Sequence, residues 1–457
     1  MPFKIKATYG VTILAGLALL PIEASAVTLH EALVQAYRTN PTLESSRASL
    51  RAQDETVVQA GAGMRPTVTA SGSAAVSQAL DSVVPPADTL RASLDARLTI
   101  FDGGRTAEAV NAAANMVFAA RENLKASSQS TLLSAATAYL DVRRDQKFLA
   151  LSQNEVNVNQ QQLKAMEDRF AVGAVTRTEV ALVQARLAAT KTSLAASSGR
   201  LALSQEIYRA VVGAEPTNLQ PTPALPRLPN SLAEAESIAM REHPSIRAAR
   251  FSEKAAEHDV ERARSAVSPT VSLTGSLAYS NTPVDVVGAT VGVAGQVPIY
   301  NGGVLSSSMR SAAQALEGRK ATTQNVMRQI RQATASSWAN IRVARASIVA
   351  ANLQIEASQI AYNGILEETR LGSRTTLDLL DAEQELLSAK SNLASAQRDE
   401  YVAALNLLSS MGLLTVENLD LGIPAYDPEV NFNEVTKQSG STFSGSKILD
   451  AIGDRWE

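Results

Sequence analysis

The acidic residues Asp378 and Asp381 lie in a segment with the composition of an α-helix. Residues three apart in a helix share one face, so both carboxylates belong to the same side. If three copies of the chain surround a common axis, these acids form two stacked rings of carboxylates. Such rings favour cations in a narrow pore. The pair therefore suggests an ion-selective constriction.

The two acids follow one of two similar turns, at residues 172–179 and 371–378. In each turn a glycine ends one helix, and a threonine a few residues later can cap the next helix, with an acid in its first turn. Ordinary helical-hairpin chemistry is sufficient to explain Gly173, Thr176, Gly372 and Thr375, and on these residues alone it is the favoured interpretation. The paired acids of the second hairpin favour a functional role there.

Patterns typical of enzymes or metal sites are missing from the sequence. It has no cysteine, only three histidines, no phosphate-binding glycine loop and a formal charge of −3. Paired acids on an exposed helix lack the burial that tunes a general acid. His243 before Pro244 aligns with Asn40 before Pro41, which indicates a helix cap rather than a ligand. We expect no enzyme, no cofactor, no metal and no nucleic-acid partner.

The elements that position these residues occur twice in the chain. Residues 28–73 align with residues 231–276, and Phe101 onward aligns with Tyr300 onward at an offset shorter by four residues. Each copy is predicted to contain a helix, two strands and two very long helices. Five prolines make the connection between the copies stiff and irregular. The first repeat, the linker and the second repeat are residues 27–215, 216–230 and 231–423.

Alternation of apolar and polar residues predicts two strands in each repeat. In residues 90–100 every even position is apolar, while the opposite face carries Arg91, Asp95 and Arg97. Four strands cannot close a barrel, but three chains together supply twelve strands around a water-filled interior. We therefore expect Arg91, Asp95 and Arg97 to face the lumen and the apolar positions to face lipid.

Long proline-free segments follow each pair of strands. No proline occurs between Ala87 and Glu215 or between Ile299 and Ile423. A helix from about Thr106 to Val172 is ~100 Å long at 1.5 Å per residue. Leucines spaced by seven, with alanines between them, predict coiled-coil packing. The heptad leucines of the last long helix are Leu379, Leu386 and Leu393.

The two ends of the chain differ from the repeats. Residues 1–26 have the pattern of a cleavable secretory signal, with Lys4 and Lys6 before an apolar run and Ala24-Ser25-Ala26 at its end. A chain without cysteine offers no site for an N-terminal lipid anchor. Residues 424–457 form a polar tail without a counterpart in the first repeat, and we expect it to be dispensable for membrane insertion.

The chain resembles the TolC family of outer-membrane efflux and secretion channels. The resemblance lies in the duplicated order of elements, in the two turns and in the two strand ends, Phe101-Asp102-Gly103-Gly104 and Tyr300-Asn301-Gly302-Gly303. The resemblance covers about residues 28–412. It implies a homotrimer that shares one barrel among outer-membrane lipids of a bacterium and continues through the periplasm as a cylinder of coiled helices. It also implies a periplasmic adaptor (membrane fusion) protein and an inner-membrane RND or ABC transporter as partners.

The same resemblance assigns roles to the two turns. The adaptor docks at the hairpin tips, which here are Val172, Gly173, Leu371 and Gly372. In the family, two aspartate rings lie at the periplasmic aperture, and an arginine just before them joins the network that keeps it shut. The matching residues are Asp378, Asp381 and Arg374, with Thr178 and Glu179 as candidate partners from the first hairpin.

Two departures from the family pattern concern this aperture. Thr369 stands where a tyrosine is frequent, and Glu179 replaces an aspartate, so the contacts that hold the aperture closed are expected to differ. The alternative function is a non-conducting coiled-coil spacer of the cell envelope. The polar strand face favours the duct. A wide aqueous bore has no selective pocket, so drug efflux and protein secretion are not distinguished.

Overall fold

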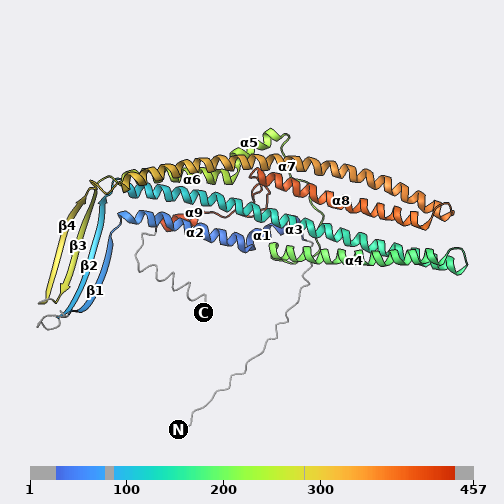
Figure 1. Cartoon of the computed structure of the whole chain (residues 1–457), viewed down its shortest axis with the longest axis horizontal. Coiled ribbons are helices and arrows are strands. Elements are labelled where there is room, and N and C mark those ends of the chain that lie inside the picture. The colour runs from blue at the N-terminus through green and yellow to red at the C-terminus, as the bar shows by residue number, and fades with distance from the viewer. Residues whose placement is uncertain (1–26, 78–86, 282–283, 438–457) are drawn as a thin grey trace, which may run out of the picture.

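The computed structural model describes residues 27–77, 87–281 and 284–437 (Figure 1). The predicted signal, residues 1–26, lies outside the described residues, as do parts of the two strand-connecting loops and residues 438–457. The molecule is elongated, with the strands at one end and the turns of the long helices at the other (Figure 1). No helix within the described ranges is both long enough and apolar enough to cross a membrane.

Four antiparallel strands form one sheet in sequential order. The strands are β1 (Thr67–Ser77), β2 (Ala87–Phe101), β3 (Thr270–Ser280) and β4 (Val286–Gln296). Asp95 of β2 lies opposite Thr69 of β1 and Ser276 of β3. Leu94, on the other face, lies opposite Leu277. The register therefore places polar with polar and apolar with apolar residues, so the sheet has one polar and one apolar face.

Each repeat ends in a pair of long antiparallel helices. The helices are α3 (Arg105–Ala171), α4 (Arg177–Val212), α7 (Val304–Arg370) and α8 (Thr376–Ser410). The heptad residues Leu379 and Leu386 of α8 are buried, as are Val180 and Leu187 of α4. Leucine seams of this kind hold antiparallel helices together, which confirms the predicted coiled packing.

Two short helices, rather than the single one predicted, precede the strands of each repeat. They are α1 (Leu29–Thr39) and α2 (Pro41–Gly61), followed by the 3-10 helix η1 (Ala62–Met64), and α5 (Leu232–Glu242) and α6 (Pro244–Ser265). The prediction of one helix is wrong because proline is accommodated in the first turn of a new helix, where its missing N–H costs nothing. Asn40 and His243 are the N-caps of these second helices, in agreement with the predicted capping role.

The main hydrophobic core lies at mid-length, where the short helices meet the long ones. Tyr139 of α3 is fully buried, and its hydroxyl donates to the carbonyl oxygens of Val27 and Gln220 at 3.1 and 2.7 Å. The phenol therefore ties the start of the first repeat and the inter-repeat linker to α3. Residues 216–229 contain no helix or strand.

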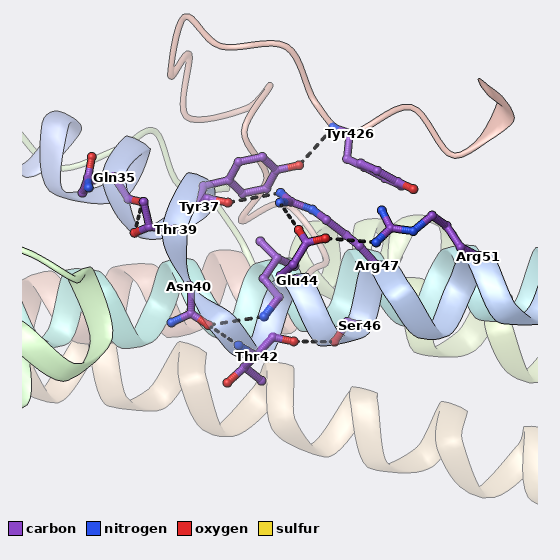
Figure 2. Close-up of polar contacts among 11 residues, drawn as sticks. Gln35, Tyr37, Thr39, Asn40, Thr42, Glu44, Ser46, Arg47, Arg51 and Tyr426 are labelled. Atoms are coloured by element: carbon purple, nitrogen blue, oxygen red, sulfur yellow. Dashed lines mark hydrogen bonds and ion pairs between the residues drawn. The ribbon is translucent and has the colours of Figure 1, made fainter. Parts of the chain in front are cut away.

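The first part of the C-terminal tail packs on the helices of the first repeat. It includes a helix, α9 (Glu429–Lys437), that was not expected in a polar tail. The backbone N–H of Tyr426 donates to the hydroxyl of Tyr37 at 3.1 Å, and the Arg47 guanidinium lies between the two rings (Figure 2). Further along, Asn431 donates to the buried carboxylate of Asp54 at 2.7 Å. Residues 424–437 therefore form a strap across α1 and α2.

Candidate functional site

The two helical hairpins, α3–α4 and α7–α8, end together at the extremity opposite the sheet (Figure 1). A small apolar cluster joins them there, formed by Met166 of α3, Val180 and Val183 of α4 and Leu380 of α8. All the residues predicted for the aperture and for adaptor contact lie at or next to these tips.

The first tip is a capped helical turn. Gly173 adopts φ +74°, a left-handed conformation that ends α3 at low cost because glycine has no Cβ. Thr176 then starts α4 as its N-cap. Its side chain accepts the N–H of Glu179, while the Glu179 carboxylate accepts the N–H of Thr176 at 2.7 Å. This capping box explains the Thr176–Glu179 spacing by local structure.

The second tip repeats the same geometry with an aspartate. Gly372 adopts φ +81°, and Thr375 is the N-cap of α8. The Asp378 carboxylate accepts the hydroxyl of Thr375 at 2.8 Å and its backbone N–H at 3.0 Å. These two hydrogen bonds hold the pKa of Asp378 below its ordinary value. Asp378 is therefore ionised at neutral pH, and the neighbouring Asp381 is exposed.

Arg374 lies between the second glycine and these acids. Its Nε atom pairs with Oε2 of Glu368 at 3.0 Å, across the turn of its own hairpin. Thr178 is exposed on the first hairpin, and Glu179 is engaged in its cap. Among the described residues of one chain, no ion pair joins Arg374 to Glu179.

Apolar side chains project from both tips into solvent. Val172 is 79% exposed and Leu371 is 84% exposed, each directly before the turn glycine. Thr369, two residues before Leu371, is instead buried. Its hydroxyl has no hydrogen-bond partner in the described part of the chain. Exposed apolar residues at the extremity of a long hairpin are suited to contact with another protein.

The polar residues predicted for the lumen lie on one face of β2. Arg91, Asp95 and Arg97 are exposed in the isolated chain, and Asp95 accepts the hydroxyl of Ser93 at 2.7 Å. They lie at the sheet end of the molecule, the whole length of the helices away from Asp378 (Figure 1). Two polar sites at opposite extremities are therefore present in each chain.

The contacts that fix the second hairpin to the first are not predicted from the sequence. Arg186 of α4 donates to the carbonyl oxygen of Leu380 at 3.3 Å and to Oε1 of Gln384 at 2.8 Å. Glu368, the partner of Arg374, is not predicted either. A six-residue separation across a turn follows neither helical nor strand periodicity, so no pattern in the sequence points to this pair. Residues 27–77, 87–281 and 284–437 contain no group of three side chains arranged to hold a metal ion.

A two-faced antiparallel sheet joined to long coiled hairpins defines the architecture of an outer-membrane channel protein. The profile of a family described as outer membrane efflux protein matches residues 32–214 and 237–413. The chain belongs to this family, in agreement with the resemblance to the TolC family. Members of the family are channels rather than enzymes.

Individual relatives and structures agree with this assignment. The chain is 35% identical to the outer membrane efflux protein BepC of Brucella suis over 428 residues, 93% of each chain. It is 26% identical to the outer membrane protein TolC of Escherichia coli, over 89% of this chain and 87% of that protein. The outer membrane channel CmeC of Campylobacter jejuni has the same fold, with a TM-score of 0.73 at 15% identity and coverage of 97% and 99%.

Proposed function

We propose that three copies of the chain form an export duct that spans the outer membrane and the periplasm. β1 and β4 are the outer strands of the sheet, and an outer strand offers backbone N–H and C=O groups to a further strand. Three sheets joined edge to edge give a twelve-stranded barrel with the polar face inside. The polar face that runs across neighbouring strands is the observation that carries this proposal.

The hairpin tips are proposed as the docking site for a periplasmic adaptor, which connects the duct to an inner-membrane RND or ABC transporter. The exposed side chains of Val172 and Leu371, with Gly173 and Gly372 beside them, support this assignment. The relative BepC is an outer membrane efflux protein, which supports small compounds rather than secreted proteins as cargo. The protein acts as a passive conduit and not as an enzyme.

The proposed route to the membrane begins with the signal in residues 1–26, which is removed after Ala26. The mature chain then inserts without lipidation of a cysteine, since it contains none. Residues 27–215 and 231–423 are proposed as the two structural repeats, joined by the linker 216–230. The tail 424–457 follows the second repeat.

The proposed aperture lies at the tips. Asp378 and Asp381 of three chains form carboxylate rings around the axis, which concentrate cations at the constriction. Arg374, with Thr178 and Glu179 of the first hairpin as further partners, contributes to the closed state. The pairing of Arg374 with Glu368 supports a role in ordering the turn that precedes the rings.

The test of the duct is the mass of the protein extracted from outer-membrane fractions in mild detergent. We expect a trimer that dissociates on heating and that conducts ions in a planar bilayer. A monomer with a native, mainly helical circular dichroism spectrum would contradict the proposal. A stable trimer without conductance would instead favour the envelope spacer.

A further inference from the structure

A polar cluster lies between the two hairpins, a short distance along the helices from the tips. Glu383 of α8 projects toward α3, where its Oε2 atom accepts a hydrogen bond from Nε2 of Gln162 at 3.1 Å. Its Oε1 atom lies 3.5 Å from Nδ2 of Asn159. Glu155, one turn further along α3, is only 5% exposed. Two carboxyl groups from different hairpins therefore lie in one site, in which Glu155 is buried and Glu383 is partly buried.

Charged groups from the other helices surround this pair. Arg186 of α4 is close enough to favour the ionised forms of both acids, but its guanidinium donates hydrogen bonds to α8 at Leu380 and Gln384. Tyr362 of α7 has a raised pKa, first because it is buried and then because of the charge of Glu383. No ion pair neutralises Glu383 or Glu155 among the described residues. An ionised pair at this position is therefore poorly compensated.

The amide groups around Glu383 are suited to a protonated carboxyl. Buried oxygens Oδ1 of Asn159 and Oε1 of Gln162 have no hydrogen-bond donor within the described part of the chain. A carboxylate can only accept hydrogen bonds, whereas a protonated carboxyl also donates one. Nδ2 of Asn159 also donates to the carbonyl oxygen of Glu155 at 3.0 Å, which holds that amide in place, so Gln162 is the amide that can rotate. After this rotation the protonated carboxyl of Glu383 donates to Oε1 of Gln162. Proton binding thus removes the uncompensated charge, and the new O–H bond to Oε1 replaces the N–H bond that Gln162 gives up.

We propose that Glu383 is a positioning residue for the aperture, and that its protonation strengthens the contact between the second hairpin and the first. The proposal rests on the proposed function, because the aperture is that of the duct. Glu383 follows Asp378 and Asp381 on the same helix. Movement of α8 away from α3 therefore displaces the proposed carboxylate rings with it.

The direction of the pH effect follows from the burial of the carboxyl. Burial raises the pKa of Glu383 from 4.5 to about 6, the charge of Glu155 acts in the same direction, and Gln162 and Arg186 act in the opposite one. When α8 leaves α3, water reaches the carboxyl and its pKa returns toward the ordinary value. The joined state therefore binds the proton more tightly. It gains stability as pH falls from about 6 toward 4.5 and loses this stability as pH rises back to about 6. Each unit of pKa difference changes the ratio of joined to separated hairpins about tenfold per subunit.

The test is the conductance of the purified full-length trimer in planar bilayers between pH 4.5 and pH 7.5. We expect the native channel to open more often as pH rises from 4.5 to about 6 and to change little above that. Glu383→Gln, neutral at every pH, should stay mostly closed and lose this dependence, whereas Glu383→Asp should retain a titration. The matched control is Glu385→Gln, which removes an exposed carboxylate two residues away and should leave the pH profile as in the native channel.

A native pH profile in an intact Glu383→Gln trimer would overturn the proposal. If that variant fails to assemble, spin labels at Lys164→Cys of α3 and Asn392→Cys of α8 report the separation of the hairpins in a chain that otherwise contains no cysteine. The distance distribution should narrow from pH 7.5 to pH 5, and an unchanged distribution contradicts the proposal. Failure of the duct itself is distinguishable, because a protein that conducts at no pH contradicts the proposed function as well.

Discussion

The guanidinium of Arg374 is paired with the carboxylate of Glu368, six residues earlier and on the other side of the hairpin turn. The arginine that precedes the two aspartates is therefore held by the end of α7. Both side chains are about half exposed, so one such pair contributes only ~0.5 kcal/mol. Threefold repetition around an axis multiplies this small effect.

Removal of either partner of the Arg374–Glu368 pair should destabilise the closed arrangement of the hairpin tip by the same amount. We expect Arg374→Ala and Glu368→Gln each to raise the conductance of the closed channel, with a change of about twofold per subunit in the opening equilibrium. Single-channel recordings at low salt measure this change. The control is Arg370→Ala, which breaks a comparable exposed pair with Glu367 and removes the same charge from the same helix end. An equal effect of the control would contradict a specific role for Arg374.

The N-cap of α6 predicts a pH-dependent stability. Nδ1 of His243 accepts the N–H of Ser245 at 3.1 Å, which requires a neutral ring, and burial lowers the pKa of His243 to about 4. The unfolded chain takes up a proton near pH 6.5 and the folded chain only near pH 4. The free energy of unfolding is therefore highest above pH 6.5 and falls as pH drops toward 4, by on the order of 3 kcal/mol.

His243→Asn should keep the cap and remove this pH dependence. The first repeat supplies the precedent, because Asn40 caps α2 by accepting the N–H groups of Thr42 and Leu43 (Figure 2). Thermal unfolding of the detergent-solubilised protein at pH 7 and pH 4.5 measures the difference. His30→Asn, at an exposed histidine, is the control and should behave as the native protein does. A native loss of stability at pH 4.5 in the His243 variant would show that the acid sensitivity arises elsewhere.

Local chemistry explains which parts of the fold could be predicted from the sequence. The absence of proline between Ala87 and Glu215 predicts a helix from Thr106 to Val172, and α3 spans Arg105–Ala171. The cap role of His243 followed from its alignment with Asn40. The single helix predicted before the strands is wrong, because Pro41 begins a second helix, α2, instead of lying within a continuous one.

Contacts between the two hairpins were beyond prediction from the sequence. Glu383 and Gln162 come from different repeats, and the rotation of α8 against α3 depends on how two coiled pairs pack together. A heptad pattern identifies the residues that pack between the two helices of one hairpin. It does not identify the residues with which one hairpin contacts the other hairpin. The residues predicted for the aperture and for adaptor contact lie together at the tips, whereas the contacts among them required the structure.

The C-terminal strap should contribute to stability without being needed for assembly. The Arg47 guanidinium lies 5.0 Å from the ring centre of Tyr37 and 5.4 Å from that of Tyr426. Tyr426→Ala removes the cation–π contact between Arg47 and the ring of Tyr426 and should lower the free energy of unfolding by ~1 kcal/mol. Tyr426→Phe keeps the ring and should have a smaller effect. Thermal unfolding measures the loss, and gel analysis without heating should still show trimers. Loss of trimers would contradict the proposed dispensability of the tail for insertion.

Asp378 and Asp381 are proposed to line a cation-attracting constriction of an outer-membrane duct. The double variant Asp378→Asn/Asp381→Asn removes both charges but keeps a side-chain oxygen that can accept the N–H of Thr375. Glu206→Gln/Glu215→Gln removes the same number of carboxylates at mid-length, near Arg209, and serves as the control. The reversal potential of the purified trimer in a salt gradient is the decisive measurement. We expect a clear loss of cation preference in the aspartate variant and none in the control, whereas unchanged selectivity in the aspartate variant would contradict the proposed constriction.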